Sequence, residues 1–501
     1  MAQGIVIAGT HSGCGKTTVT LGLLAALQKK GLKVQSFKAG PDFIDAGLHK
    51  IITGRPSRNL DLWMCKEDYV RNCFHKNSID ADISIIEGVM GMYDGGFSTA
   101  RLASFLELPV ILVVDAYGMA ESAGAVVKGF MEFIDTEIND SQCRRFAASP
   151  RRIVGVIFNR VASDRHYERL KDSVNGVTVL GYLPRDLDFE IPHRHLGLTV
   201  AEENPITGDN LERLVDAVLK HCDVEKLIAL QNSPLEKGDK GGCQASGKGQ
   251  RQETTPLPPF IKGEFVGSMI AVAYDKAFCF YYEDNIEMLR DLGAEVIKFS
   301  PISDPGIPDG ADCLYIGGGY PELYAEGLSK NISMLKSVNE WASSGRPIYA
   351  ECGGLMYLSQ GIYDFDRNFH KMACALPFET QMKKGRSRLG YREIALKEDC
   401  ILGRKDSIVR GHEFHYSEII NSAGANSRCS STRKAGSAEG KNNFTNVTSG
   451  LNGIYSVQDS SGRYIQDEGH AFKNILASYM HIHFGSNPEI ADNFMKFIKE
   501  N

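Results

Sequence analysis

The first part of the chain alternates short, continuous apolar runs with longer amphipathic segments. The runs are rich in branched residues, as is typical of strands buried on both faces. They are Gly4–Ala8, Val34–Phe37, Ile83–Ile86, Val110–Val114, Ile153–Phe158 and Val177–Leu180. Longer segments such as Thr17–Lys30 and Gly118–Phe133 predict crossover helices. Together they predict an α/β fold with a doubly wound parallel sheet and helices on both faces.

This alternation stops at Gln231–Glu264, where Gly, Lys, Ser, Gln and Pro dominate and apolar periodicity is lost. Such a segment buries too little apolar surface to order itself. Alternation then resumes, with predicted strands Met269–Ala273, Glu295–Phe299, Cys313–Ile316 and Pro347–Ala350 and predicted helices Asn285–Leu292 and Lys330–Ser343. We therefore predict two domains, residues 1–229 and 266–501, joined by a flexible linker at 230–265. Asn421–Ser449 is expected to be a long surface loop.

Composition narrows the class of protein. A chain of 501 residues exceeds one ordinary core. A net charge of -6 argues against a general nucleic-acid binder, and no apolar run approaches the roughly 18 residues of a membrane span. The twelve cysteines include no C-x-x-C pair, and no basic segment precedes the first apolar run. Both features favour the reducing cytoplasm over a secreted, disulfide-linked protein. The oligomeric state stays open, a homodimer being one arrangement that the chain allows.

A phosphate loop is predicted at Gly9–Thr17, GTHSGCGKT, which follows a strand and opens a helix. Backbone N–H groups around Gly13 and Gly15 would cradle phosphates, with Lys16 on the β and γ oxygens and Thr17 as a Mg²⁺ ligand. Thr18, the next helical residue, is included in this ATP site. Five residues rather than the usual four separate Gly9 from Gly15, and the alternative is a chance glycine-rich turn.

Polar residues follow other strands of the same sheet. Glu87 ends one strand and is a candidate Mg²⁺ ligand. Asp45, shortly after the cation Lys38, and Asp94, in a glycine-rich loop, could position substrate or metal; the alternative is capped turns with solvated charges. Asn159 could present its amide to an adenine edge, or could belong to an ordinary Asn turn.

Cys352 is the candidate nucleophile of the second domain. It lies between a predicted strand and the helical Leu355–Leu358 and is followed by two glycines. A tight strand-to-helix turn exposes a nucleophile, and the helix N-terminus is expected to lower the pKa of its thiol. The N–H of Gly353 could stabilise an oxyanion, and Gly318, in a second glycine turn, could supply another. The alternative is a buried structural cysteine.

The base that would activate Cys352 should be a histidine distant in sequence. His481 and His483 lie on a predicted extended segment, and because they are two residues apart their side chains should share a face. His412 and His415 compete with them. The residues alone leave this choice open.

The chain resembles the cobalamin-type glutamine amidotransferase family over both predicted domains. The strings that carry the resemblance include GTHSGCGKTT, KAGPDFIDAGLH, EGVMGMYDG, GGGYPEL, AECGGLMYL, RGHEFHYS and ASYMHIHFGSNP. The first half is similar to dethiobiotin synthetase-type ligases, whose phosphate loops share the five-residue spacing. The second half is similar to class I glutamine amidotransferases.

This resemblance implies ATP- and glutamine-dependent amidation of the a and c acetate carboxylates of cobyrinate, a tetrapyrrole, through acyl phosphates. Cys352 would release ammonia from glutamine with His481 as its base, and Mg²⁺ would bind at Thr17 and Glu87. Class I enzymes usually carry a Glu two residues after that histidine, but this chain has His483, which leaves open what orients His481.

Three alternatives remain at this stage. Two are related amidations, those of cobyric acid synthase and of a synthase acting on nickel-sirohydrochlorin. The third belongs to another class: a P-loop ATPase switch whose second domain binds without catalysing.

Overall fold

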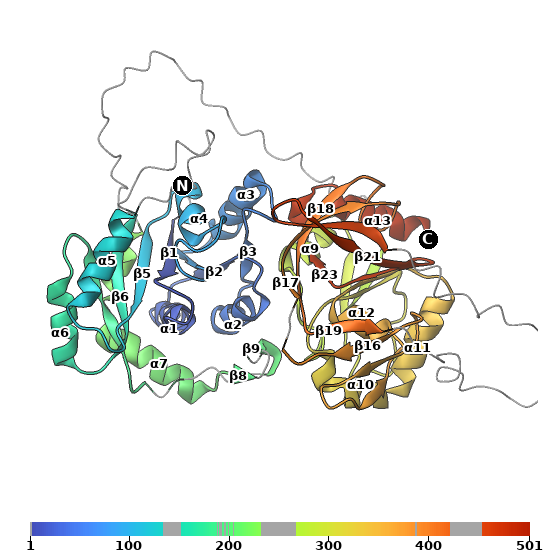
Figure 1. Cartoon of the computed structure of the whole chain (residues 1–501), viewed down its shortest axis with the longest axis horizontal. Coiled ribbons are helices and arrows are strands. Elements are labelled where there is room, and N and C mark those ends of the chain that lie inside the picture. The colour runs from blue at the N-terminus through green and yellow to red at the C-terminus, as the bar shows by residue number, and fades with distance from the viewer. Residues whose placement is uncertain are drawn as a thin grey trace, which may run out of the picture. The chain divides into compact units, whose positions relative to one another are not determined.

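The computed structural model describes residues 3–133, 152–187, 189, 193–194, 197–198, 200–203, 205–231, 267–385, 388–420 and 453–501. Two compact units, Met1–Leu257 and Pro258–Asn501, divide the chain (Figure 1). The predicted linker lies outside the described residues from position 232 onward, and the predicted loop Asn421–Ser449 lies outside them throughout. None of the helices in the described ranges combines the length and the hydropathy that a membrane span needs.

Within the described residues of the first unit, seven strands form one parallel sheet in the order β3-β2-β4-β1-β5-β6-β7. Each apolar run predicted as a strand is confirmed, and β3 is a further short strand at the edge. The strands are β1 (Gly4–Gly9), β2 (Val34–Ala39), β3 (Arg58–Leu60), β4 (Ile83–Glu87), β5 (Val110–Asp115), β6 (Ile153–Val161) and β7 (Thr178–Pro184).

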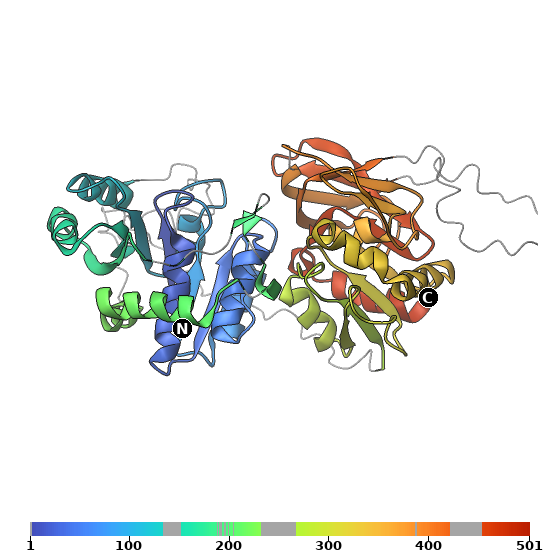
Figure 2. The same ribbon diagram turned by 90° about the horizontal axis from the view of Figure 1, so that it is seen from below.

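Helices cover both faces of this sheet. Crossovers between parallel strands are right-handed, so connections that run in opposite directions along the sheet place their helices on opposite faces. Figure 1 shows α3 and α4 on one side of the strands and α1, α2 and α7 on the other; seen from below in Figure 2, the green helix α7 crosses the blue helix α1. The helices are α1 (Lys16–Lys29), α2 (Phe43–Thr53), α3 (Glu67–Ser78), α4 (Thr99–Phe105), α5 (Ser122–Glu132), α6 (Asp164–Ser173), α7 (Gly208–His221) and α8 (Val224–Leu230).

Helix α1 is apolar on nearly all sides because it packs between the sheet and other helices. Its buried residues Val19–Leu27 join a core formed with β1, β5 and α7. The helix that carries the phosphate loop is therefore held rigidly. The predicted helix Gly118–Phe133 begins later than expected, at Ser122.

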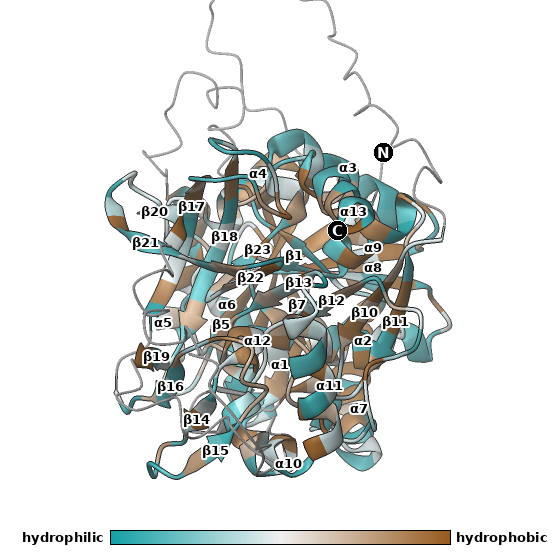
Figure 3. Cartoon of the chain, turned by 90° about the vertical axis from the view of Figure 1, so that its right-hand side faces the viewer, coloured by the Kyte–Doolittle hydropathy of each residue, from teal (hydrophilic) through white to brown (hydrophobic). Residues whose placement is uncertain are grey.

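In the second unit, the described residues form a ten-stranded mixed sheet in the order β11-β10-β12-β13-β22-β21-β20-β17-β18-β23. Its first five strands are parallel: β11 (Glu295–Phe299), β10 (Met269–Ala273), β12 (Cys313–Ile316), β13 (Ile348–Glu351) and β22 (Ile475–Ser478). The rest are antiparallel: β21 (Tyr464–Phe472), β20 (Gly453–Asp459), β17 (Arg388–Leu396), β18 (Ile408–His415) and β23 (Met480–Ile482). Figure 3 shows brown, hydrophobic residues along central strands such as β10 and β12.

The antiparallel part of this sheet curls back toward the parallel part. Only Tyr479 separates β22 from β23 in the chain, although they are the fifth and tenth strands in the sheet order. As a result β18 and β23 reach the carboxyl end of β13, where the backbone N–H of Ile482 donates to Glu351. This curl places histidines distant in sequence next to the predicted nucleophile.

Smaller elements complete the second unit. A four-stranded sheet contains β15 (Phe369–Lys371), β14 (Gly361–Tyr363), β16 (Glu379–Met382) and β19 (Ser417–Ile420). The helices are α9 (Glu283–Asp291), α10 (Ala325–Lys330), α11 (Ile332–Ser343), α12 (Gly353–Leu358) and α13 (Ile490–Glu500). The predicted helix Lys330–Ser343 is broken at Asn331, because the Asn331 side chain caps α11 by accepting the N–H of Met334.

Candidate functional site

The predicted phosphate loop connects β1 to α1, as the sequence indicates. Gly15, with a φ of 94°, precedes the helix, and a Cβ there would lie 1.9 Å from Nδ2 of Asn159. Lys16 is buried and its Nζ donates to the carbonyl of His11, 3.2 Å away, so the amine folds over the loop. Gly13, also with positive φ, is exposed in the loop, and Thr18 is half-buried in the first turn of α1. The loop has the form that cradles phosphates.

Below the loop, Thr17 is linked to a buried cluster of charges. Its hydroxyl donates to Oε1 of Glu87 at 2.7 Å and lies 3.5 Å from Oδ2 of Asp45. Nζ of Lys38 lies 2.5 Å from Asp45 Oδ2 and 3.0 Å from Glu87 Oε1. The structure thus brings together residues from α1, α2, β2 and β4 that the sequence placed at one sheet edge.

His49 belongs to the same cluster, although it was not among the residues predicted from the sequence. Its Nε2 lies 2.7 Å from Oε2 of Glu87 and its Nδ1 lies 3.2 Å from Oγ of Ser57. His49 follows Asp45 by four residues on α2, so the two side chains share one face of the helix. This spacing is the signal that could have identified it.

The cluster holds more negative than positive charge. Burial alone would raise the pKa of Glu87, but Lys38 and His49 outweigh burial and hold that pKa well below its usual range. Burial, with repulsion from Asp42 and Glu87, raises the pKa of Asp45 well above its usual value. Burial would lower the pKa of Lys38, but Asp45 and Glu87 raise it instead. Lys38 is therefore cationic, and the cluster favours a further cation.

The donor set fits Mg²⁺. Thr17 Oγ1 and Glu87 Oε1 lie 2.7 Å apart, close to the roughly 3 Å between neighbouring oxygen ligands of an octahedral ion. The described residues hold no group of three or more His, Cys, Asp and Glu suited to a metal. Mg²⁺ usually takes one or two protein ligands and completes its shell with water and substrate phosphates.

Two further predicted residues of this domain, Asp94 and Asn159, make hydrogen bonds to the backbone. Asp94 is exposed, and its Oδ2 accepts the N–H of Gly91 at 2.7 Å, so in this conformation it closes its own loop. Asn159 donates from Nδ2 to the carbonyl of Cys14 at 3.0 Å. This bond uses the amide nitrogen to fix the phosphate loop and leaves Oδ1 as the part of the amide that could meet a base.

In the second unit, Cys352 stands on a strained turn between β13 and α12. Its backbone has φ 48° and ψ −101°, in a region that L-residues rarely adopt. Its N–H donates to the carbonyl of Ser478 at 2.7 Å, and Sγ lies 3.7 Å from the carbonyl oxygen of Phe414. A Cβ on Gly354 would lie 2.2 Å from the carbonyl of Ile316, so the turn needs a glycine there. This geometry is typical of a nucleophile elbow.

The expected lowering of the thiol pKa by the helix is wrong for this structure. Burial raises the pKa of Cys352 above its ordinary value, and the carboxylate of Glu322 raises it further. The N–H of Gly353 opposes this effect only in part. The thiol is therefore protonated at rest and needs a base to become a nucleophile.

The two predicted oxyanion glycines are not equivalent. The N–H of Gly318 donates to the carbonyl of Phe280 at 3.3 Å, in a bridge that Phe280 N–H returns to Gly318 at 3.0 Å. A Cβ on Gly353 would lie 3.2 Å from the nitrogen of Gly319. The Gly318 N–H is thus already paired in this conformation, and the backbone nitrogen of Gly319 is the one that lies beside Gly353. A glycine triplet in a sequence does not show which of its N–H groups is available, so the role predicted for Gly318 stays a prediction.

His481 is the histidine that meets the glycine turn. A Cβ on Gly318 would lie 2.2 Å from its Cε1. The His481 ring stacks on that of His412, with centroids 4.8 Å apart. Burial lowers the pKa of His481 to about 3, which keeps its ring neutral, as a base must be. Because Gly353 packs beside Gly319 and Pro321, the nucleophile elbow and His481 contact the same turn.

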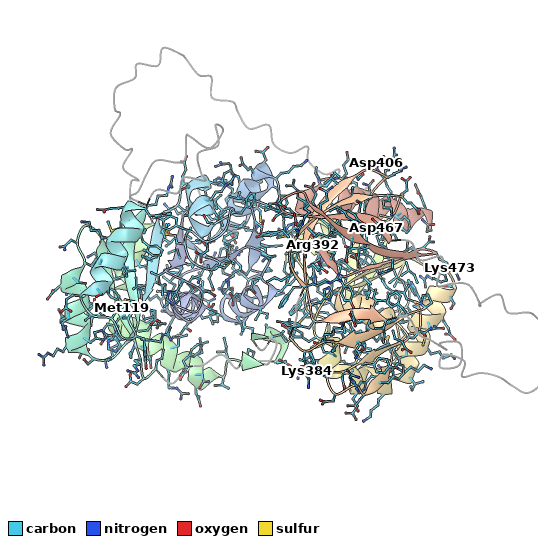
Figure 4. All side chains as sticks on the ribbon, viewed as in Figure 1. Met119, Lys384, Arg392, Asp406, Asp467 and Lys473 are labelled. Atoms are coloured by element: carbon cyan, nitrogen blue, oxygen red, sulfur yellow. The ribbon has the colours of Figure 1, made fainter. Side chains whose placement is uncertain are left out.

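The competing histidines have other hydrogen bonds. His412 pairs through Nδ1 with the hydroxyl of Tyr282 at 2.7 Å. His415 uses Nδ1 on the carbonyl of Ser417 and Nε2 on Glu413, at 2.7 and 2.9 Å. Arg392, labelled in Figure 4, donates to the same Glu413 at 2.8 Å.

His483 continues the predicted extended segment, since its backbone has φ −91° and ψ 119° and its N–H donates to the carbonyl of Arg410 on β18 at 3.1 Å. Strand β23 ends at Ile482, and His483 caps the short helix Phe484–Ser486 by accepting the N–H of Gly485 at its Nδ1. The Nδ1 of His483 is thus used in this cap, whereas His481 is the histidine that lies against the glycine turn.

Among the described residues, eight cysteines are free thiols, Cys352 included. Cys374 is the exception, since it is disulfide-bonded.

Comparison with known proteins agrees with a phosphate loop in the first unit and a nucleophile elbow in the second. Residues 5–198 match the CobQ/CobB/MinD/ParA nucleotide binding domain, and residues 269–489 match the CobB/CobQ-like glutamine amidotransferase domain. A protein named cobyrinate a,c-diamide synthase from Syntrophotalea carbinolica is 39% identical over 99% of this chain and 98% of its own. Those of Caldanaerobacter subterraneus and Salmonella typhimurium are 42% and 38% identical, over 84% and 98% of this chain and 87% and 97% of theirs.

The chain belongs to the cobyrinate a,c-diamide synthase family. It is accordingly an amide-forming, glutamine-hydrolysing ligase of cobalamin biosynthesis, with a nucleotide-binding domain ahead of its amidotransferase domain. The family-level fold that the sequence predicted, a P-loop domain followed by a class I amidotransferase domain, is confirmed.

Replacing Lys38 tests the buried charge cluster. Lys38→Met leaves Asp45 and Glu87 without their shared cation, so we expect the free energy of unfolding to fall by about 3–5 kcal/mol in urea titrations followed by circular dichroism. The control is Lys29→Met, which breaks an exposed pair with Asp216 and should have no measurable effect. Equal losses in the two variants would contradict the paired cluster.

Gly318→Ala tests the contact between the glycine turn and His481. The added methyl would displace the ring, and we expect glutamine hydrolysis to slow about 100-fold, as is usual for a misplaced catalytic group. Gly327→Ala is the control, because its Cβ would meet only Ile302, at 3.7 Å. Normal glutaminase rates in Gly318→Ala would show that the ring is not needed there.

Proposed function

We propose that this chain converts the a and c acetate carboxylates of cobyrinate into amides, using ATP and ammonia released from glutamine. Full-length similarity to proteins named for this reaction carries the choice of substrate. The strained elbow at Cys352 supports glutamine as the nitrogen source, and the loop at Lys16 supports ATP as the source of activation.

In the glutaminase half, Nε2 of His481 takes the proton of the Cys352 thiol, and the thiolate attacks the side-chain amide of glutamine. A glutamyl thioester forms and the C–N bond breaks, with the proton of the imidazolium passing to the leaving ammonia. The N–H groups of Gly353 and Gly319 would bind the oxyanion. Water then hydrolyses the thioester to glutamate and regenerates the thiol.

In the synthetase half, a carboxylate of the tetrapyrrole attacks the γ-phosphorus of ATP, giving an acyl phosphate and ADP. A free carboxylate is a poor electrophile, and phosphorylation supplies the leaving group that ammonia displaces as phosphate. Lys16 would neutralise charge on the transferred phosphoryl group. Asp45, whose carboxylate is paired with Lys38, would help to position substrate or metal.

Mg²⁺, when bound, would offset negative charge on the ATP phosphates, and Thr17 and Glu87 are the residues that would hold it. His49 fixes the orientation of Glu87 through Oε2, in the way that neighbouring groups orient metal-binding carboxylates. Asp94, which closes its own loop in this conformation, could turn toward bound substrate.

The substrate assignment is tested by offering ATP, Mg²⁺ and glutamine with cobyrinate, its metal-free form or nickel-sirohydrochlorin, and weighing the products. We expect cobyrinate to gain two amides and to react fastest. Faster amidation of the nickel compound would move the chain to that related reaction. ATP turnover with no amide on any of the three would favour the ATPase-switch alternative.

Cys352→Ala should abolish amidation driven by glutamine and leave amidation driven by a high ammonium concentration intact. Cys313→Ala, which alters a buried cysteine on the ordinary strand β12, is the control and should keep both. Lys16→Ala should lose both, because activation precedes the use of either nitrogen source. Loss of both in Cys352→Ala would instead indicate a structural cysteine.

A further inference from the structure

Glu351 is the last residue of β13 and immediately precedes Cys352. Its side chain is buried, and Oε1 accepts the hydroxyl of Tyr349 at 2.7 Å and the N–H of Ile482 at 3.0 Å. Oε2 accepts the hydroxyl of Tyr315 at 3.2 Å. Nδ1 of His481 lies 4.0 Å from that same Oε2. A carboxylate with both oxygens fixed therefore faces the histidine.

Position 483, two residues after His481, cannot provide this carboxylate. His483 is occupied in capping the turn at Gly485, and its ring packs against Tyr282 with centroids 4.5 Å apart. Yet a histidine that acts as base on a thiol works best when a third group fixes its tautomer. Glu351 reaches the same ring from a different strand.

We propose that Glu351 is the positioning residue for His481. Oε2 of Glu351 accepts the Nδ1 proton, so that Nε2 carries the lone pair that removes the proton of Cys352. This inference rests on the proposed glutaminase roles of Cys352 and His481. The 4.0 Å separation has to shorten by about 1 Å, as often happens when a substrate binds, because catalytic hydrogen bonds are commonly long in ligand-free enzymes.

The charge states suit this arrangement. Burial raises the pKa of Glu351 to about 7, against its three hydrogen bonds, so the group is mostly ionised above that pH. His481 is neutral at the same pH. His412 and His415 are the titratable neighbours of His481, and those of Glu351 are Tyr281, Tyr315, Tyr349, Tyr455 and Cys352. The Cys352 thiol also faces Glu322, Glu413 and Tyr479.

The surroundings of Glu351 determine what a glutamine would do in its place. The backbone N–H of Ile482 is a fixed donor to Oε1, so the amide oxygen of Glu351→Gln must take that position. The amide NH₂ then takes the position of Oε2 and points at His481. A donor replaces an acceptor there, which favours the tautomer that has its proton on Nε2 and cannot act as base.

We therefore expect Glu351→Gln to lower kcat for glutamine hydrolysis by about 10²- to 10⁴-fold, as a reversed tautomer does in other histidine-dependent hydrolases. KM for glutamine should change little, and ammonia-driven amidation should survive, which shows that the variant folds. Glu351→Asp keeps the acceptor and should recover part of the rate. A merely structural role predicts the opposite order, since Gln matches the shape of Glu and Asp does not.

A second test measures how the alkylation of Cys352 by a chloroketone analogue of glutamine depends on pH. The direction in which the midpoint of this curve shifts in Glu351→Gln distinguishes the two roles of Glu351. Direct repulsion from Glu351 raises the thiol pKa, so removing that charge alone would move the alkylation midpoint to lower pH. If the charge of Glu351 stabilises the imidazolium that pairs with the thiolate, removing that charge moves the alkylation midpoint to higher pH. We expect the higher value.

Glu468→Gln is the matched control. Glu468 is also buried, burial raises its pKa to about 7, and it also accepts a backbone N–H, that of Tyr479, at 2.7 Å. It should leave the alkylation midpoint unchanged. If the alkylation midpoint of Glu351→Gln is lower than that of the wild type or unchanged, the inference about Glu351 is wrong, while the glutaminase assignment remains intact. That assignment fails separately if Cys352→Ala still hydrolyses glutamine.

Discussion

A buried carboxylate stays ionised only where hydrogen-bond donors surround it, and each candidate centre of this protein is arranged around such a group. Glu87 has Thr17, Lys38 and His49 as partners. Glu351 has two tyrosine hydroxyls and a backbone N–H. Without these donors the pKa of either group would be higher, and the neighbouring side chain, Thr17 or His481, would face a neutral carboxyl group.

Both carboxylates occupy the same place in their sheets. Glu87 is the last residue of β4 and Glu351 the last residue of β13, and each strand lies between two parallel neighbours. Parallel strands present their carboxyl ends at one edge, where loops and helix N-termini meet. Strands that are buried on both faces hold this edge in place. The continuous apolar runs therefore fix the positions of the polar residues that follow them.

The sequence predicted much of this organisation because its strongest signals are local. Continuous apolar runs give the strands, and the Gly9–Thr17 and Cys352–Gly354 turns follow those strands directly. Signals that depend on packing were weaker. The predicted lowering of the Cys352 pKa was wrong because the effect of the helix N-terminus is outweighed by burial and by the nearby carboxylate of Glu322. Choosing among four histidines required the curl that brings β23 to β13, and the contact between Glu351 and His481 has no periodicity to reveal it.

If glutamine hydrolysis and ATP-driven activation serve one reaction, the nitrogen released from glutamine must appear in the amide, and isotope transfer measures this directly. With cobyrinate, ATP, Mg²⁺ and glutamine labelled with ¹⁵N at its side-chain amide, we predict that each amide formed carries one ¹⁵N atom. One ADP and one glutamate should appear with each amide. Glutamate and ADP that accumulate without labelled product would contradict the account, because the two centres would then act independently of any amide synthesis.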